Sequence, residues 1–179
     1  MKAKWYGVYT RINCEKKVSD FLTRRKIENF YPSVAVPNKW SFIKKYTTAP
    51  ILPSYIFVHT DEDQIATIKN FPDVINFLYW IGKPVIIQDA EIEIMKSISA
   101  GVSPVKVQKS KINLEKIDQG PKISSSEVDG VRTFKVTIRS IGYSIITQID
   151  SPKLSIFLSP GSNHGSETHG ELLNQHLAN

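Results

Sequence analysis

Apolar and polar positions do not alternate in residues 54–60, SYIFVHT, as they do in a strand with one solvated face. Side chains in a strand point alternately to opposite faces, so Ile56 and Val58 share one face and Tyr55 and Phe57 share the other. Both pairs suit a core. The pattern therefore indicates that both faces of this strand suit burial, and it leaves open what covers the second face.

Strand-like and helix-like patterns alternate over the first hundred residues. Clusters of aromatic and β-branched residues predict strands, and apolar residues at helical spacing predict amphipathic helices. The predicted strands are 5–12, 30–36, 54–60 and 74–81, and the predicted helices are 14–27 (N-cap Asn13, stop at Asn29), 61–70, and 89–99 (N-cap Asp89). This order predicts an α+β fold in which helices pack on a sheet.

The pattern changes after the first hundred residues. Residues 101–112 contain Gly, Ser, Pro and Lys without helical spacing and are predicted to be a linker. Apolar and polar residues alternate in 133–141, which predicts a half-buried strand, and 144–150 is its expected hairpin partner. Residues 113–159 are therefore predicted to form a small β-barrel, and the polar residues 160–179 a flexible tail.

Charge is distributed unevenly along a chain whose net charge is +6. Residues 1–45 contain 11 Lys and Arg against 3 Asp and Glu. Such an excess is expected of a face that meets a polyanion, and a solvated basic surface is the other interpretation. No apolar run is long enough for a transmembrane helix, and one cysteine, Cys14, excludes a disulfide framework. A reducing, cytoplasmic setting is expected.

Catalytic motifs are missing from the sequence. It contains no P-loop, no GxGxxG and no nucleophile elbow. Cys14 lies on the predicted apolar stripe of a helix, so it is interpreted as a core residue rather than a nucleophile. His164, His169 and His176 fall in the polar tail, which favours disorder over metal binding. The chain is therefore not expected to be an enzyme or to need a cofactor or metal.

Residues 37–50 are rich in lysines and aromatic residues and are predicted to form a hairpin or long loop. Lysines supply charge for phosphates, and aromatic rings supply surfaces on which bases stack. The segment is interpreted as a nucleic-acid contact, and the alternative is that Trp40 and Phe42 pack on the sheet. The residues concerned are Lys39, Trp40, Phe42, Lys44, Lys45 and Tyr46.

Four separated blocks carry a family resemblance: WYGVYTR, EKKVSDFL, PILPSYIFV and DVINFLYWIGKPVIIQDAEIEIM. Over residues 4–99 they resemble, in order, the N-terminal (NGN) domain of NusG-type transcription elongation factors. Their details are most similar to the specialised paralogues, namely RfaH and the UpxY branch linked with capsular polysaccharide operons. General NusG usually has Gly where Ser54 stands.

The C-terminal half resembles the KOW-containing small barrel of the same family. Gln119-Gly120-Pro121 matches the start of the KOW motif, and SIGYSIITQID matches its last hairpin. The Gly expected a few residues after Pro121 is missing, so the resemblance implies a degenerate, SH3-like barrel. It implies an NGN domain over 1–100 and a KOW-like barrel over 113–159, whose partner, a ribosomal protein or another factor, stays open.

The resemblance implies that an apolar patch docks on the clamp helices of RNA polymerase. Matched by motif, the patch consists of Tyr9, Leu52, Tyr55 and Phe57. An aromatic surface of this kind is suited to the centre of an interface. The alternative is that Tyr55 and Phe57 lie under a helix or under the second domain, which masks the patch in some family members until recruitment.

The resemblance also gives roles to polar residues. Side chains that would face upstream or non-template DNA are Arg11, Lys16, Lys17, Lys39, Trp40, Lys44 and Lys45. A second polymerase contact, on the opposite pincer, is carried over to Gln64 and Thr67.

The expected function is antitermination. A monomer of this kind would bridge the DNA channel, hold the clamp closed and suppress pausing and termination, acting on a specific operon for polysaccharide biosynthesis. The main alternative is a KOW-type RNA-binding or ribosome-associated module that does not act on polymerase, and an enzyme that uses Cys14 is a second one.

Overall fold

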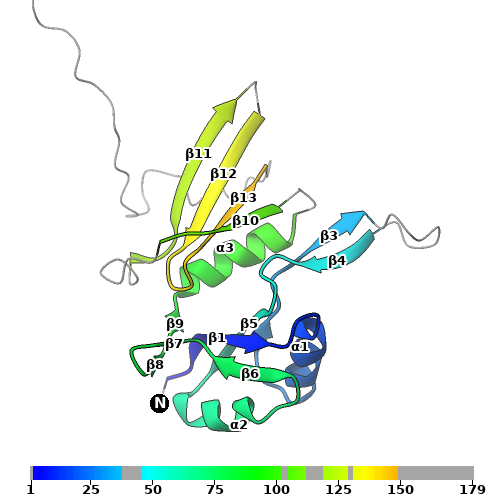
Figure 1. Cartoon of the computed structure of the whole chain (residues 1–179), viewed down its shortest axis with the longest axis vertical. Coiled ribbons are helices and arrows are strands. Elements are labelled where there is room, and N and C mark those ends of the chain that lie inside the picture. The colour runs from blue at the N-terminus through cyan, green and yellow to red at the C-terminus, as the bar shows by residue number, and fades with distance from the viewer. Residues whose placement is uncertain (1, 38–45, 102–104, 112–118, 129–130, 149–179) are drawn as a thin grey trace, which may run out of the picture.

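The computed structural model describes residues 2–37, 46–101, 105–111, 119–128 and 131–148. These residues combine helices with sheets, as the sequence predicts, and strands predominate. One sheet and its helices come from the N-terminal part, and a second sheet comes from residues 105–147. Helix α3 (Asp89–Ser99) lies between the two sheets (Figure 1).

The N-terminal sheet is antiparallel and has the order β2-β5-β1-β6, with β9 pairing the start of β1. Its strands are β1 (Lys4–Thr10), β2 (Asn29–Phe30), β5 (Tyr55–Thr60), β6 (Val74–Phe77) and β9 (Ile86–Ile87). In the central pair, Tyr9 lies opposite Tyr55 and Gly7 lies opposite Phe57. Two small hairpins accompany this sheet: β3 (Ser33–Pro37) with β4 (Tyr46–Pro50), and β7 (Tyr79–Trp80) with β8 (Lys83–Pro84).

One face of the N-terminal sheet is covered by α1 (Glu15–Arg24) and α2 (Ile65–Lys69), which follows a short 3-10 turn, η1 (Glu62–Gln64). Ile56 and Val58 of β5 form a buried cluster with Val18 and Leu22 of α1 and Ile68 of α2. This face therefore corresponds to the helix-covered side that the sequence predicts.

Helix α1 is shorter at both ends than predicted. Asn13 has φ 62, a left-handed conformation, and Cys14 takes the N-cap position instead. At the other end Lys26 has φ 60, and the amides of Lys26 and Ile27 donate to the carbonyls of Thr23 and Leu22. These two bonds form a Schellman motif, which ends the helix before the predicted stop at Asn29. Helix α3 also begins differently, because Gln88 and not Asp89 is its N-cap.

The C-terminal sheet is antiparallel, with the order β10-β13-β12-β11. Its strands are β10 (Val105–Lys109), β11 (Lys122–Val128), β12 (Val131–Ile138) and β13 (Tyr143–Thr147). Within the described segments this sheet is open, so the predicted closed barrel is not confirmed. The prediction of a linker over 101–112 is wrong for 105–109, because Val105 and Val107 pack on the core and their strand pairs with β13.

The second face of β5 is covered by parts that are distant in sequence. Tyr55 and Phe57 belong to one buried cluster with Ile94, Met95 and Ile98 of α3 and with Ile138, Ile141 and Ile145 of the C-terminal sheet. Helix α3 and the C-terminal sheet therefore supply the cover that the unbroken apolar pattern requires. None of the helices in the described segments is long and apolar enough to cross a membrane.

Candidate protein-binding face

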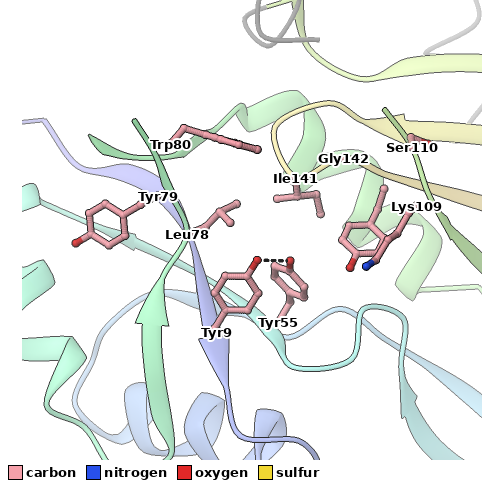
Figure 2. Close-up of a pocket in the computed structure, with 10 residues that line it drawn as sticks. Tyr9, Tyr55, Leu78, Tyr79, Trp80, Lys109, Ser110, Ile141 and Gly142 are labelled. Carbon is pink, nitrogen blue, oxygen red and sulfur yellow. Dashed lines mark hydrogen bonds between the residues drawn. The ribbon is translucent and has the colours of Figure 1, made fainter. Parts of the chain in front are cut away.

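Two tyrosines stand side by side at the edge of the covered face. Tyr9 of β1 and Tyr55 of β5 are opposite in register, their ring centroids are 4.6 Å apart, and the Tyr55 hydroxyl donates to the Tyr9 hydroxyl at 2.7 Å (Figure 2). Burial, and then the bond to Tyr9, raises the pKa of Tyr55 far above its usual value. Tyr55 is therefore a neutral phenol, and Tyr9, which is half-buried, is the more accessible of the pair.

The turn before β5 is held by a buried acid. Ser54 has φ 65, and its amide donates to Oε1 of Glu15 at 2.6 Å, while its carbonyl accepts from the Thr10 amide at 2.9 Å. Glu15 is the first residue of α1 and is 2% exposed. From the sequence, Glu15 is only an acid in the favourable first turn of a helix. Its role in fixing the turn that leads into Tyr55 was therefore missed.

Of the four residues predicted to form the polymerase patch, three are buried in this structure. Leu52 and Phe57 are 1% and 0% exposed, and Tyr55 is 7% exposed. Phe57 lies near Phe30 of β2, with ring centroids 6.2 Å apart, and both belong to the covered cluster. Only Tyr9 keeps substantial exposure, so the four side chains do not form an open surface together.

The turn between β12 and β13 closes over this face. The Tyr143 ring meets the Tyr55 ring edge-on, with centroids 5.8 Å apart. Next to this contact, residues from both sheets surround a cavity of about 400 Å³, with Tyr9, Tyr55 and Leu78 on one side and Ile141 and Gly142 on the other (Figure 2). We call the surface formed by Tyr9, Tyr55, Leu78 and Trp80 the aromatic face. Sequence patterns gave no signal that Tyr143 covers it.

A second contact joins the turn to helix α3. Glu91 is fully buried, and its carboxylate accepts from the Ser140 hydroxyl at 2.5 Å and from the Ser140 amide at 3.2 Å. Burial raises the pKa of Glu91, and the hydrogen bonds oppose that rise. Neither residue was identified from the sequence, because a helix-start Glu and a turn Ser are usually solvated.

The basic residues predicted to meet DNA are placed only in part. Lys17 and Arg11 converge on Asp73, with N–O distances of 2.7 Å and 3.7 Å, and both cations remain about 70% exposed. The hydrogen bond from Lys17 lowers the pKa of Asp73. Lys16 pairs with Asp20 at 2.9 Å on the exposed side of α1. Lys39, Trp40, Lys44 and Lys45 lie outside the described residues.

The residues carried over for a second polymerase contact lie elsewhere on the molecule. Gln64 and Thr67 are exposed around α2, which covers the opposite face of the N-terminal sheet from the aromatic face. The Gln64 side-chain oxygen accepts from the Thr60 hydroxyl at 3.0 Å. The two predicted contact sets therefore lie on different sides of the sheet.

The described residues offer little for catalysis. They contain no group of three His, Cys, Asp or Glu residues placed to hold a metal ion. Cys14 is half-buried at the start of α1 and is not on a helical core stripe as predicted, because the helix begins after it. The aromatic face itself presents apolar rings and a few hydroxyls.

Comparisons with known proteins identify a family. A family model described as "Transcription termination factor nusG" matches residues 3–96, slightly more than half of the chain. A solved structure described as "Domain interaction in Thermotoga maritima NusG" shares 20% identity, covers 84% of this chain and 99% of that chain, and has a TM-score of 0.42. No curated protein matches the sequence. The family match ends before β10, so the C-terminal sheet lies outside it.

Proposed function

The chain belongs to the NusG family, and from that premise we propose that it is an antitermination factor that docks on the RNA polymerase clamp helices through its aromatic face. NusG-family proteins are non-enzymatic transcription elongation and termination factors that bind RNA polymerase. In this chain the proposed contact uses Tyr9 and Tyr55, with Leu52 and Phe57 in the same cluster as support.

The pairing of Tyr9 with Tyr55 is the observation that carries this proposal. Both rings sit on the central strand pair of the matched region, so their backbone is held by the β1–β5 ladder. Their hydroxyls bond to each other, which leaves apolar ring surface for a partner. Tyrosines of this kind, rigid and partly apolar, are enriched among residues that dominate protein interfaces.

Docking requires that the C-terminal sheet leave this face. Tyr143 contacts the ring of Tyr55, and Ile141 borders the same cavity. A clamp helix and the β12–β13 turn cannot occupy the same ring surface at once. The covered arrangement is therefore the unbound form in this proposal, and polymerase binding selects an uncovered form.

The mechanism is mechanical. A protein that holds the clamp through one face and meets the opposite pincer through Gln64 and Thr67 bridges the DNA channel and stabilises the active state against pausing. Arg11, Lys16 and Lys17 add sequence-independent attraction to nearby DNA through counterion release. Two finer features are proposals as well: a KOW-like barrel in the C-terminal part, and a UpxY-like role in one polysaccharide operon.

Binding of the full chain to core RNA polymerase tests this function. We expect Tyr9→Ala to weaken binding by about 2 kcal/mol, as truncation of an interface hot spot does. Tyr143→Ala should strengthen binding, because it removes a contact that competes for the Tyr55 ring. Tyr31→Ala is the matched control, since Tyr31 packs on the opposite, helix-covered cluster.

Three results would contradict the proposal: no binding of the unmodified chain, equal binding of the Tyr9 variant, or equal loss in the Tyr31 control. Thermal unfolding followed by circular dichroism shows whether each variant is folded. Retention of RNA binding by a chain that ignores polymerase would instead support an RNA-binding module.

A further inference from the structure

Glu91 is an unusual residue to find without solvent contact. It occupies the third position of α3, and none of its surface is exposed. Glutamates are almost never fully buried unless their charge is paired or hydrogen-bonded. The environment of its carboxylate therefore calls for a specific explanation.

Donors from two different parts of the fold meet at this carboxylate. The Gln88 amide at the start of α3 donates to Oε2 at 3.3 Å. From the β12–β13 turn, the Ser140 hydroxyl donates to Oε2 at 2.5 Å and the Ser140 amide donates to Oε1 at 3.2 Å. One side chain of the family-matched region thus binds both the backbone and the side chain of a residue in the C-terminal sheet.

Other contacts of that turn with the N-terminal part involve aromatic and apolar side chains. Tyr143 lies edge-on to Tyr55, and Ile141 belongs to the shared cluster. Apolar burial is non-directional and tolerates sliding, whereas hydrogen bonds to a charged acceptor depend on distance and angle. The turn itself is firm, because the Gly142 amide donates to the Ile138 carbonyl and the Ser110 amide donates to the Gly142 carbonyl.

We propose that Glu91 is the polar anchor that fastens the β12–β13 turn to helix α3 and so keeps the C-terminal sheet over the aromatic face. This inference rests on the proposed function, because it specifies what controls access to the docking surface. Ser140 is the partner of Glu91 in the turn, and its hydroxyl and amide donate the two hydrogen bonds. Loss of either side frees the turn, while the N-terminal sheet stays folded.

Protonation adds a second property to the anchor. Burial raises the pKa of Glu91 while it is covered, and an uncovered Glu91 would return to the usual value of about 4.3. The part of its contribution that depends on protonation is therefore complete below that value and is lost as pH rises through the raised pKa, whereas the hydrogen bonds from Ser140 remain. The groups that face the carboxylate are the Gln88 amide on α3 and Ser140 with the Arg139 backbone on the turn. The Arg139 guanidinium donates to Gln119 at 3.1 Å.

Amide hydrogen exchange of the full chain, followed by NMR, tests the anchor directly. The residue-140 amide is the reporter, because it donates to the Glu91 carboxylate. Ser140→Ala keeps that amide and removes only the hydroxyl. We expect Ser140→Ala and Glu91→Ala, which each remove one partner of the hydrogen bond, to lower its protection factor about tenfold or more, the change that corresponds to losing about one hydrogen bond.

Exchange elsewhere separates anchoring from general stability. Amides of Tyr6 and Val8 in the β1–β5 ladder should change by less than about twofold, since local opening leaves that ladder intact. Glu93→Ala is the matched control, because Glu93 is exposed on the same helix and pairs with Lys96. The proposal is overturned if residue 140 and the ladder lose protection together, or if the Glu93 control has the same effect as the Glu91 variant.

The dependence of the protection factor on pH separates an ionisable anchor from a purely structural contact, because only an ionisable group makes protection at residue 140 vary with pH. In the unmodified chain the protection factor at residue 140 should fall as pH rises above about 4.3. In Glu91→Gln it should be independent of pH, and a retained dependence would contradict the assignment.

Polymerase affinity is measured separately. A Ser140 variant that uncovers the face without binding polymerase more tightly contradicts the docking function and leaves the anchor standing.

Discussion

Ser54 adopts a backbone conformation that most residues avoid, and Glu15 compensates for it. At φ 65 a side chain crowds the following carbonyl, which costs roughly 1–2 kcal/mol for a residue other than glycine. The hydrogen bond from the Ser54 amide to the buried Glu15 carboxylate holds the turn in that conformation. A glycine at this place, as the resemblance to general NusG suggests, fits the same turn without strain.

Removing the Glu15 carboxylate should therefore lower stability. Glu15→Ala leaves the Ser54 amide without its acceptor, and hydrogen bonds to charged groups contribute about 1.5–3 kcal/mol. Urea unfolding of the full chain gives the change in free energy of unfolding. Lys16→Ala, on an exposed neighbour, is the control and should shift the midpoint little. A Glu15 variant as stable as the control would show that the turn does not depend on this bond.

At the scale of elements, helix α1 ends through backbone geometry rather than at a stop residue. Lys26 lies in the left-handed region that glycine usually occupies at this position, and Ile27 then turns back onto the helix-covered cluster. Arg24, only two residues earlier, is still helical. The same substitution should have opposite effects at these two positions.

Lys26→Gly is expected to raise the free energy of unfolding by about 0.5–1 kcal/mol, because glycine relieves the left-handed strain. Arg24→Gly should lower it by about 1 kcal/mol, the usual cost of glycine within a helix. Both values come from urea unfolding monitored by helical circular dichroism. Changes of the same sign in the two variants would disprove the Schellman ending of α1.

At the scale of the whole molecule, two cations of the basic first quarter converge on one acid. Arg11 and Lys17 share Asp73, and this carboxylate offsets part of their charge. The positive electrostatic potential that DNA would meet near Arg11 and Lys17 therefore depends on the charge of Asp73. Asp73 has φ 65, which asparagine also tolerates, so its charge can be removed without changing the turn.

Asp73→Asn should tighten sequence-independent DNA binding, and Lys17→Ala should weaken it and reduce the salt slope by about one. Binding to duplex DNA is measured at several salt concentrations, because the slope counts the phosphate contacts. Lys122→Ala, on the C-terminal sheet, is the control for a general loss of charge. If the Lys122 and Lys17 variants behave alike, DNA does not meet the α1 end specifically.

Sequence patterns predicted the local elements better than the contacts between them. The resemblance assigned the second face of β5 to a polymerase contact, whereas parts of the same chain cover it in this structure. The unbroken apolar run of β5 indicated only that both faces suit burial, because residue type follows burial. It did not identify Tyr143 or Glu91 as parts of that cover, because contact between distant segments leaves no periodic signal. The strand at 105–109 was missed for a related reason, since only two valines mark it among lysines. Asn13 and Lys26 show that left-handed residues shift helix ends by a few positions.

The covered aromatic face places a competitor on the same chain as the docking surface. Tyr143 is tethered, so its local concentration near Tyr55 is set by the connecting chain, in the millimolar range for short flexible connections. That concentration does not change when the cell makes more or less of the protein. Proteins that bind apolar surfaces only weakly are therefore kept off the aromatic face at every expression level. Only a partner whose affinity exceeds a fixed threshold displaces Tyr143.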